Sequence, residues 1–155
     1  MTSGNIQHVR RFFERQAAPE GGACTRLRMW VRGCLIGCFA GLPAIASDMP
    51  SGQDVSLMEV RRDDLGADTW VRFRFLAPAI ARTGGTVDFA KAEADMAYLC
   101  ATIAVPYVTE HAFDAGRIVI SLSDREVEFG VSDPDATQYF DVFRIENDRC
   151  IWEGF

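Results

Sequence analysis

Few residues of this chain could do chemistry. One histidine lies beyond the first third of the sequence, His111, and acidic residues flank it. A histidine that accepts the proton of a serine hydroxyl, with an acid to orient its ring, is the arrangement of serine hydrolases. Ser121 or Ser123, with Asp124, would supply the other two groups. The sequence lacks the GxSxG motif that presents such a serine on a sharp turn. A small hydrolase using His111, Ser121 and Asp124 is therefore the alternative interpretation, and a non-catalytic protein is the leading one.

Two acidic clusters offer carboxylate oxygens, which are ligands that Ca²⁺ prefers. Asp63, Asp64 and Asp68 form one cluster, and Asp133 and Asp135 form the other. Neither cluster has the regular spacing of a calcium-binding loop. Aspartate is also common in turns, where its side chain bonds to the nearby backbone. We expect no metal site and no cofactor.

Residues 69–76, TWVRFRFL, alternate between two kinds of side chain, as is typical of a half-buried β-strand. One face is apolar and carries Val71, Phe73 and Phe75. The other face carries Trp70, Arg72 and Arg74. Because tryptophan and arginine dominate the energetics of protein interfaces, we predict that these three residues form a binding surface. The alternative is that the two arginines only balance the acids near them.

Residues 29–47, MWVRGCLIGCFAGLPAIAS, have the order of parts of a secretory signal peptide. An arginine precedes a short apolar run, and small residues follow at Ala44 and Ala46. The run of about ten residues is far shorter than the roughly twenty of a membrane-spanning helix, so we expect no stable membrane insertion after cleavage. Cleavage after Ala46 predicts a periplasmic or secreted protein.

The expected signal peptide, residues 29–46, divides the chain. Residues 1–28 are interpreted as a dispensable extension or a mis-assigned start, with Met29 as the alternative to Met1. Residues 47–54, SDMPSGQD, are small and polar and predict a flexible lead-in. The rest, residues 55–155, suits one domain with one modest core.

The chain has five cysteines, of which Cys24, Cys34 and Cys38 lie within or before the signal peptide. A lipid anchor on Cys38 is a minor alternative, because too few residues precede it to form a membrane-inserting core. Cys100 and Cys150 remain, and an even pair in an oxidising compartment usually bonds. We predict a disulfide between them. The alternative is two buried free thiols.

The expected mature chain is strongly acidic. Residues 1–46 hold six of the sixteen Lys and Arg residues but only two of the twenty-two Asp and Glu residues. Ten basic and twenty acidic residues remain, a net charge of about minus ten that repels phosphate backbones and anionic lipids. We therefore expect no nucleic-acid partner.

One helix is predicted, with Asp88 as its N-cap and its end near Ala104. Its apolar residues recur at spacings of three and four and form one stripe: Phe89, Ala92, Met96, Leu99, Cys100 and Ile103. The stripe places Cys100 toward a sheet. We expect Pro106 to stop the helix and residues 107–115 to form a loop or a short turn.

Strands are predicted on both sides of the helix. The first lies near residues 55–60, and an acidic loop at 62–68 separates it from the strand at 69–76. After the helix, residues 117–123 and 126–131 are predicted to pair around a tight connection at 124–125. A second hairpin turns at Asn147 and Asp148 and sets Phe143 opposite Trp152 and Ile145 opposite Cys150.

These elements predict an α+β fold. The order is β-β-α-β-β-β-β, with the amphipathic helix packed on one face of a mainly antiparallel sheet. The stretches WVRFRFLAPAI, DMAYLC, ISLSDREVEFG and CIWEGF also resemble a family of short exported bacterial proteins known only as a domain of unknown function. The resemblance covers about residues 55–155 and implies export and a single domain, but no activity or site residue. The leading hypothesis is a non-catalytic binding or interaction module with an envelope or periplasmic protein as its partner.

Overall fold

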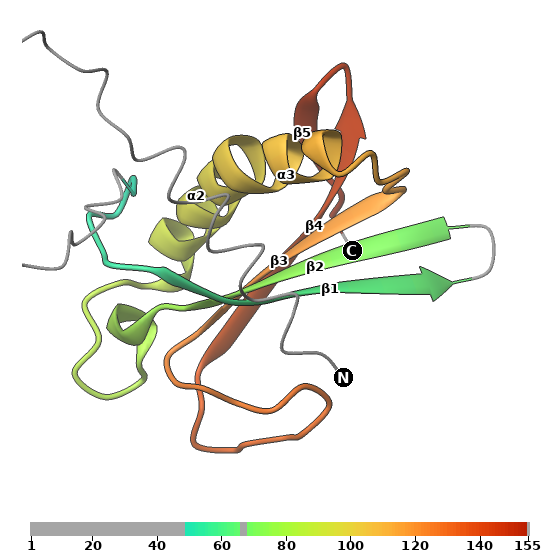
Figure 1. Cartoon of the computed structure of the whole chain (residues 1–155). Coiled ribbons are helices and arrows are strands. Elements are labelled where there is room, and N and C mark those ends of the chain that lie inside the picture. The colour runs from blue at the N-terminus through green and yellow to red at the C-terminus, as the bar shows by residue number, and fades with distance from the viewer. Residues whose placement is uncertain (1–48, 66–67, 155) are drawn as a thin grey trace, which may run out of the picture.

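A layer of helix covers one face of a five-stranded sheet (Figure 1). The computed structural model describes residues 49–65 and 68–154, so the expected extension, signal peptide and Cys38 lie outside the described residues. The strands follow the order β1-β2-β3-β4-β5, and only β2 and β3 are parallel neighbours. Their bounds are β1 Ser56–Leu65, β2 Asp68–Leu76, β3 Arg117–Ser123, β4 Gln138–Glu146 and β5 Arg149–Trp152. The predicted α+β class with a mainly antiparallel sheet is confirmed.

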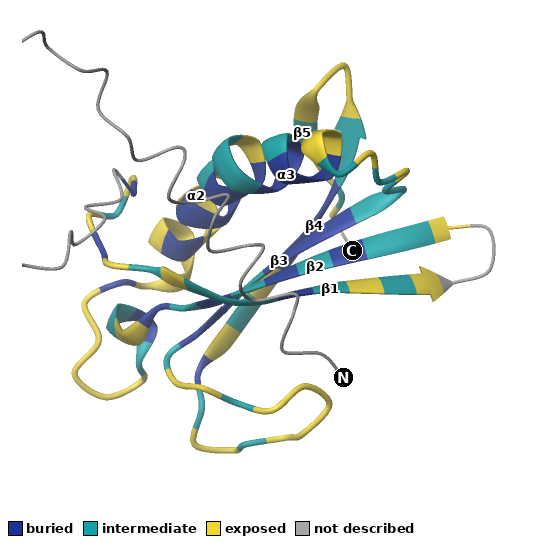
Figure 2. Cartoon of the chain, in the orientation of Figure 1, coloured by how far each residue is buried: buried dark blue, intermediate teal, exposed yellow. Residues whose placement is uncertain are grey.

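The core lies between the sheet and the helix. The apolar face of β2 is buried there, as the alternation in its sequence predicts. Alternate residues of β3 join it, because side chains along a strand point to opposite faces. The residues of these two strands in the core are Val71, Phe73, Phe75, Ile118, Ile120 and Leu122. Figure 2 shows the helix turning its buried side toward this face of the sheet.

The strand β1 is longer than predicted. It continues to Leu65, so most of the acidic stretch at 62–68 is strand rather than loop. Asp63 lies opposite Trp70 and Asp64 lies opposite Thr69. Asp63 is tolerated because its carboxylate reaches Arg72, its diagonal neighbour on β2, and opposite charges at such positions attract. Asp63 lies 2.6 Å from Arg72 in this way.

The predicted helix begins as expected and runs further. Helix α2 spans Phe89–Leu99, and Asp88 caps it by accepting a hydrogen bond from the backbone N–H of Lys91 at 3.0 Å. The predicted stripe packs in the core, except that Phe89 is half exposed and contacts the ring of Tyr139.

Pro106 does not end the helix, so that prediction was wrong. The chain passes through a wider π-helical turn, η2 at Cys100–Ala104, into helix α3 at Val105–Glu110. Proline lacks an N–H, and its ring clashes with the carbonyl four residues earlier in a regular α-helix. In the wider turn the N–H of Val105 bonds to the carbonyl of Cys100, five residues back, and Pro106 stands in the first turn of α3. The stretch expected to be a loop is therefore partly helix.

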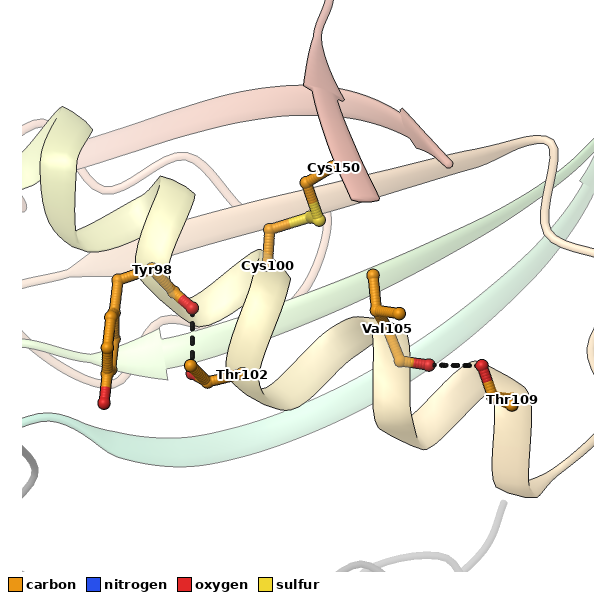
Figure 3. Close-up of a disulfide and its surroundings, with 6 residues drawn as sticks. All are labelled: Tyr98, Cys100, Thr102, Val105, Thr109 and Cys150. Carbon is orange, nitrogen blue, oxygen red and sulfur yellow. Dashed lines mark hydrogen bonds between the residues drawn. A yellow bond between two sulfur atoms is a disulfide. The ribbon is translucent and has the colours of Figure 1, made fainter. Parts of the chain in front are cut away.

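The predicted disulfide between Cys100 and Cys150 is present (Figure 3). It joins the start of η2 to β5 with a Cα–Cα distance of 6.2 Å. Beside it, the hydroxyl of Thr102 donates to the carbonyl of Tyr98 at 2.8 Å, as Figure 3 shows. The bond fastens the irregular helical turn to the last strand.

The second predicted hairpin is confirmed. Strands β4 and β5 pair with Phe143 opposite Trp152 and Ile145 opposite Cys150. Asn147 and Asp148 have φ angles of 50° and 59°, which are the left-handed values that a tight two-residue hairpin turn requires.

The first predicted hairpin was wrong. Residues 126–131 are not a strand, and β3 pairs instead with β4. Residues 124–137 form a long loop, seen at the bottom of Figure 1. Asp124 closes it, because its N–H donates to the carbonyl of Thr137 and its carboxylate accepts from the N–H of Thr137, both at 3.0 Å.

The domain begins earlier than residue 55. Met49 and Gln53 are buried, so this part of the predicted flexible lead-in is packed, contrary to expectation. Asp95 on α2 is fully buried and accepts hydrogen bonds from the N–H and hydroxyl of Ser51 and from the amide of Gln53. The composition of this short polar segment predicts flexibility, but its Ser51 and Gln53 supply the hydrogen bonds that a buried carboxylate needs.

Candidate binding surface on the outer face of the sheet

The face of the sheet turned away from α2, η2 and α3 is called the outer face here. By strand alternation and register it carries Glu59, Arg61, Asp63, Trp70, Arg72, Arg74, Arg117, Val119, Ser121, Phe140, Val142 and Arg144. Val119 and Val142 oppose each other at its centre and are buried, although neither belongs to the main core. The outer face is therefore a mixed surface with an apolar centre and charged sides.

Three arginines of the outer face share two acids. Arg74 and Arg61 lie 2.8 and 2.9 Å from the carboxylate of Glu59, and Arg72 pairs with Asp63. Burial disfavours the charged form of Glu59, but the hydrogen bonds and positive charges of Arg61 and Arg74 outweigh it and lower its pKa. Arg72 and Arg74 thus balance nearby acids, as the alternative prediction states, and each does so through one nitrogen of its guanidinium group.

Trp70 is half-buried beside these pairs. The guanidinium groups of Arg72 and Arg117 lie 5.6 and 5.8 Å from the centre of its ring, within the range of cation–π attraction. Arg117 is held in turn by Glu153, at 2.6 Å. Trp70 thus stands at the side of the outer face, next to the predicted partner Arg72.

The long loop forms a wall over part of this face. Arg74 donates to the carbonyl of Val127 at 2.6 Å. The ring of Phe129 lies under the guanidinium of Arg61, 4.0 Å from the ring centre, and Arg74 also faces it at 5.6 Å. These contacts hold residues 126–131 as a loop: the ring of Phe129 packs on two arginines, and the carbonyl of Val127 accepts a hydrogen bond from Arg74.

Between this wall and β4 lies a hollow of ≈ 210 Å³. Its lining residues are Arg72, Arg74, Val119, Ser121, Glu128, Phe129, Gly130, Val131, Gln138 and Phe140. Phe129, Val131 and Phe140 are 43%, 54% and 63% exposed, an unusual grouping of large apolar side chains at one place. Two of the three predicted binding residues, Arg72 and Arg74, therefore meet at the hollow.

Polar groups in the hollow are left without partners. The terminal nitrogens of Arg72, the hydroxyl of Ser121 and the amide of Gln138 form no hydrogen bond with the part of the chain that the structure describes. The hollow is smaller than the clefts of about 300–1,000 Å³ that usually hold drug-sized ligands, so it suits a small group. The hollow thus places exposed apolar side chains next to polar groups.

A model of a family of unknown function, DUF6497, matches residues 36–155. The chain belongs to this family. The predicted resemblance to an uncharacterised family is thus confirmed, and the match includes all of the sheet and helix. No curated protein and no solved structure matches this DUF6497 chain.

The hydrolase residues are not brought together in this DUF6497 fold. His111 follows α3 on the helical side, where its ring stacks on buried Tyr107 at 4.1 Å and its Nδ1 lies 2.8 Å from the carbonyl of Tyr107. Ser121 lies on the outer face, so the sheet separates the two side chains. Ser123 donates to the carbonyl of Arg125 at 2.7 Å. The predicted serines and His111 therefore do not come together.

Asp124 serves the loop instead of a catalytic set. Burial disfavours its charged form, but hydrogen bonds from Arg125 and from the N–H of Thr137 outweigh that effect and lower its pKa. Held in this way, the Asp124 carboxylate closes the loop at residues 124–137, which borders the hollow.

The acidic clusters are occupied by protein contacts. Asp63 pairs with Arg72, and Asp64 accepts from Arg62 and Thr69. Asp133 accepts from the N–H of Asp135, the local bond of a turn. Within residues 49–65 and 68–154, no group of three or more His, Cys, Asp or Glu side chains is placed to hold a metal ion, and no helix is long and apolar enough to cross a membrane.

Sequence reasoning missed the apolar members of the hollow. Phe140 had a readable signal, because alternation from Phe143 and Ile145, which face the helix, puts residue 140 on the other side of β4. Phe129 and Val131 had a misleading one, since EVEFGV also fits a strand. Their position becomes evident only from the loop.

Proposed function

We propose that this DUF6497 protein is a small, non-catalytic binding module of the cell envelope that holds a partner on its outer face. The observation that carries the proposal is the hollow, where three exposed apolar side chains lie beside polar groups of Arg72 and Ser121 that have no partner among the described residues. Interfaces of non-obligate complexes combine such an apolar centre with a charged surround. Here the surround is the set of arginine–carboxylate pairs on β1 and β2.

A signal-like sequence pattern and the disulfide support the envelope as the place of action. The signal-like pattern at residues 29–47 precedes a domain whose only two cysteines are joined to each other. Disulfides persist in the periplasm and outside the cell and are rare in the reducing cytosol. The acidic mature chain disfavours nucleic acid and anionic lipid as partners, so the proposal commits to a protein of the envelope.

The hydrolase alternative has no observation in its favour. General base catalysis needs the base within hydrogen-bond reach of the nucleophile. The sheet lies between His111 and Ser121, and Ser123 is committed to the backbone of its own loop. We therefore propose binding without catalysis.

Co-purification of matched variants tests the proposal. Phe140→Ala and Val131→Ser remove exposed apolar groups from the hollow, and Phe89→Ala removes a comparably exposed ring from the helical side. The mature protein is used as bait in an envelope extract, and all variants are first shown to melt like the wild type. A partner that wild type and Phe89→Ala retain, and that both hollow variants lose, supports the proposal. A partner held equally by all four, or lost only with Phe89→Ala, removes the outer face from consideration.

A further inference from the structure

We propose that the hollow recognises an apolar group that ends in a carboxylate, with Arg72 and Ser121 binding the carboxylate and Phe129, Val131 and Phe140 enclosing the apolar part. The inference rests on the proposed function, since it names the chemistry that the same site receives. The chemistry is shared by two sources, the C-terminus of a partner protein with an apolar last residue and a free aliphatic acid. The experiment below separates them.

Arg72 supplies the main polar recognition. Its Nε bonds to Asp63 at 2.6 Å, which fixes the orientation of the guanidinium plane. Its two terminal nitrogens have no acceptor among residues 49–65 and 68–154, although the side chain is largely covered. A planar guanidinium with two free N–H-bearing nitrogens matches the two oxygens of a carboxylate.

Ser121 and Gln138 supply neutral hydrogen bonds at the same place. Ser121 is opposite Arg74 on one neighbouring strand and opposite Phe140 on the other, so it lies at the centre of the hollow. Its hydroxyl and the amide of Gln138 have no partner in the described part of the chain. A hydroxyl and an amide N–H are neutral groups that can both donate hydrogen bonds to a carboxylate.

Glu128 completes the charge balance around the hollow. Arg61, Arg72 and Arg74 pair with only two acids, Glu59 and Asp63, and the carboxylate of Glu128 offsets the remaining positive charge. Glu128 also lines the hollow, and it forms no ion pair with any residue that the structure describes. The carboxylate of Glu128 therefore opposes a bound anion, so its removal should strengthen binding.

The apolar side chains of the hollow would contact the apolar part of the ligand. Val119 forms a buried floor, and Phe129, Val131 and Phe140 stand partly exposed above it. Gly130, between two of these residues, has a φ of 81°, a backbone conformation that glycine adopts without strain. The turn at Gly130 lets Phe129 and Val131 both border the hollow.

The test is an NMR titration of the ¹⁵N-labelled, oxidised mature protein with sodium hexanoate, with 1-hexanol as the neutral match and inorganic phosphate as the bare oxyanion. A peptide that ends in leucine and its C-terminally amidated form make the second arm. We expect saturable shifts for hexanoate or the free-acid peptide, centred on Ser121, Gly130 and Gln138, and much weaker binding of hexanol, phosphate and the amide. A response to the peptide alone identifies a chain terminus as the source. A response to hexanoate alone identifies a free acid and contradicts a protein partner at this hollow.

Variants give the expected changes in affinity. Arg72→Gln should weaken binding about tenfold or more, since it removes charged hydrogen bonds, and Ser121→Ala should weaken it less. Glu128→Gln should tighten binding about two- to fivefold, the size of an exposed charge interaction. The matched control is Arg144→Gln, which loses an arginine of the outer face whose ion pairs are with Glu146 and Glu153, and it should bind like the wild type.

Several results would overturn the inference. Equal binding of hexanol and hexanoate would show that the carboxylate is not recognised. If no acid binds saturably, the hollow does not bind this class of ligand. Unchanged affinity in Arg72→Gln, or in Ser121→Ala if Arg72→Gln does not fold, removes the assigned residues. The proposed function is tested separately. If no carboxylate binds but a protein partner is still lost with Phe140→Ala, the inference is wrong and the proposed function is supported.

Discussion

Breaking the disulfide between Cys100 and Cys150 should cost the domain much of its stability. The bond closes a loop with a sequence separation of 50, which includes η2, α3, β3 and β4. In the chain-entropy model, a cross-link over about fifty residues lowers the entropy of the unfolded chain by about 14 cal/mol/K, or about 4 kcal/mol at 25 °C. For a domain of this size that corresponds to a fall in melting temperature of about 15–30 °C.

The assay compares urea unfolding of the oxidised protein, of the same protein with both thiols reduced, and of the double variant Cys100→Ala/Cys150→Ala. Reduction keeps both sulfur atoms in place, so it separates loss of the cross-link from the small cavity that alanine leaves at buried Cys100. We expect the free energy of unfolding to fall by about 4 kcal/mol in the reduced protein and slightly more in the variant. A fall below about 1 kcal/mol in the reduced protein would refute the reasoning, because the loop length would then not govern the effect.

Three further predictions concern buried or capping carboxylates. Asp95→Ala should lower the free energy of unfolding by about 3 kcal/mol in urea melts, because Ser51 and Gln53 lose their buried acceptor; an unchanged midpoint would show that the N-terminal segment is not anchored there. Asp88→Ala should cost about 1 kcal/mol by loss of the α2 N-cap, and equal melts of variant and wild type would contradict that role. Burial raises the pKa of Asp141, and the negative charge of Glu93 raises it further. A hydrogen bond from Trp152 lowers it but does not outweigh these effects. The folded state then holds the Asp141 proton more tightly than the unfolded chain, so this residue lowers stability as the pH rises above about 4. Asp141→Asn should therefore be more stable than wild type at pH 7, with a difference that shrinks as the pH falls toward 3, and a less stable variant at pH 7 would be the contrary result.

The parts of the fold that sequence predicts are those with local rules. The period-two pattern of residues 69–76 places Arg72 and Arg74 on one face, and the Asn147–Asp148 turn fixes the register of β4 and β5. That register, with the helical stripe, brings Cys150 over Cys100, so the disulfide follows from two local patterns. Each pattern is decided by residues close in sequence, where few alternatives compete.

The parts that escaped depend on distant contacts. Residues 126–131 have the alternation of a strand, but Arg61 and Arg74, more than fifty residues earlier, offer contacts that hold them as a loop. Pro106 was expected to end the helix, but the wider turn at η2 removes the need for its N–H. The hollow depends on that loop, so the sequence indicated one side of the site, Arg72 and Arg74, and not its apolar wall.

Site-specific photocrosslinking in living cells tests most directly whether the outer face is the binding surface. A photoreactive phenylalanine analogue is placed at Phe140 in the hollow or, as the matched position, at Phe89 on the helical side; both are exposed aromatic positions. We predict a discrete crosslinked product from position 140 that is absent from position 89 and that disappears when Val131→Ser is added. Crosslinks from position 89 alone, or from neither position at native expression, would contradict the account.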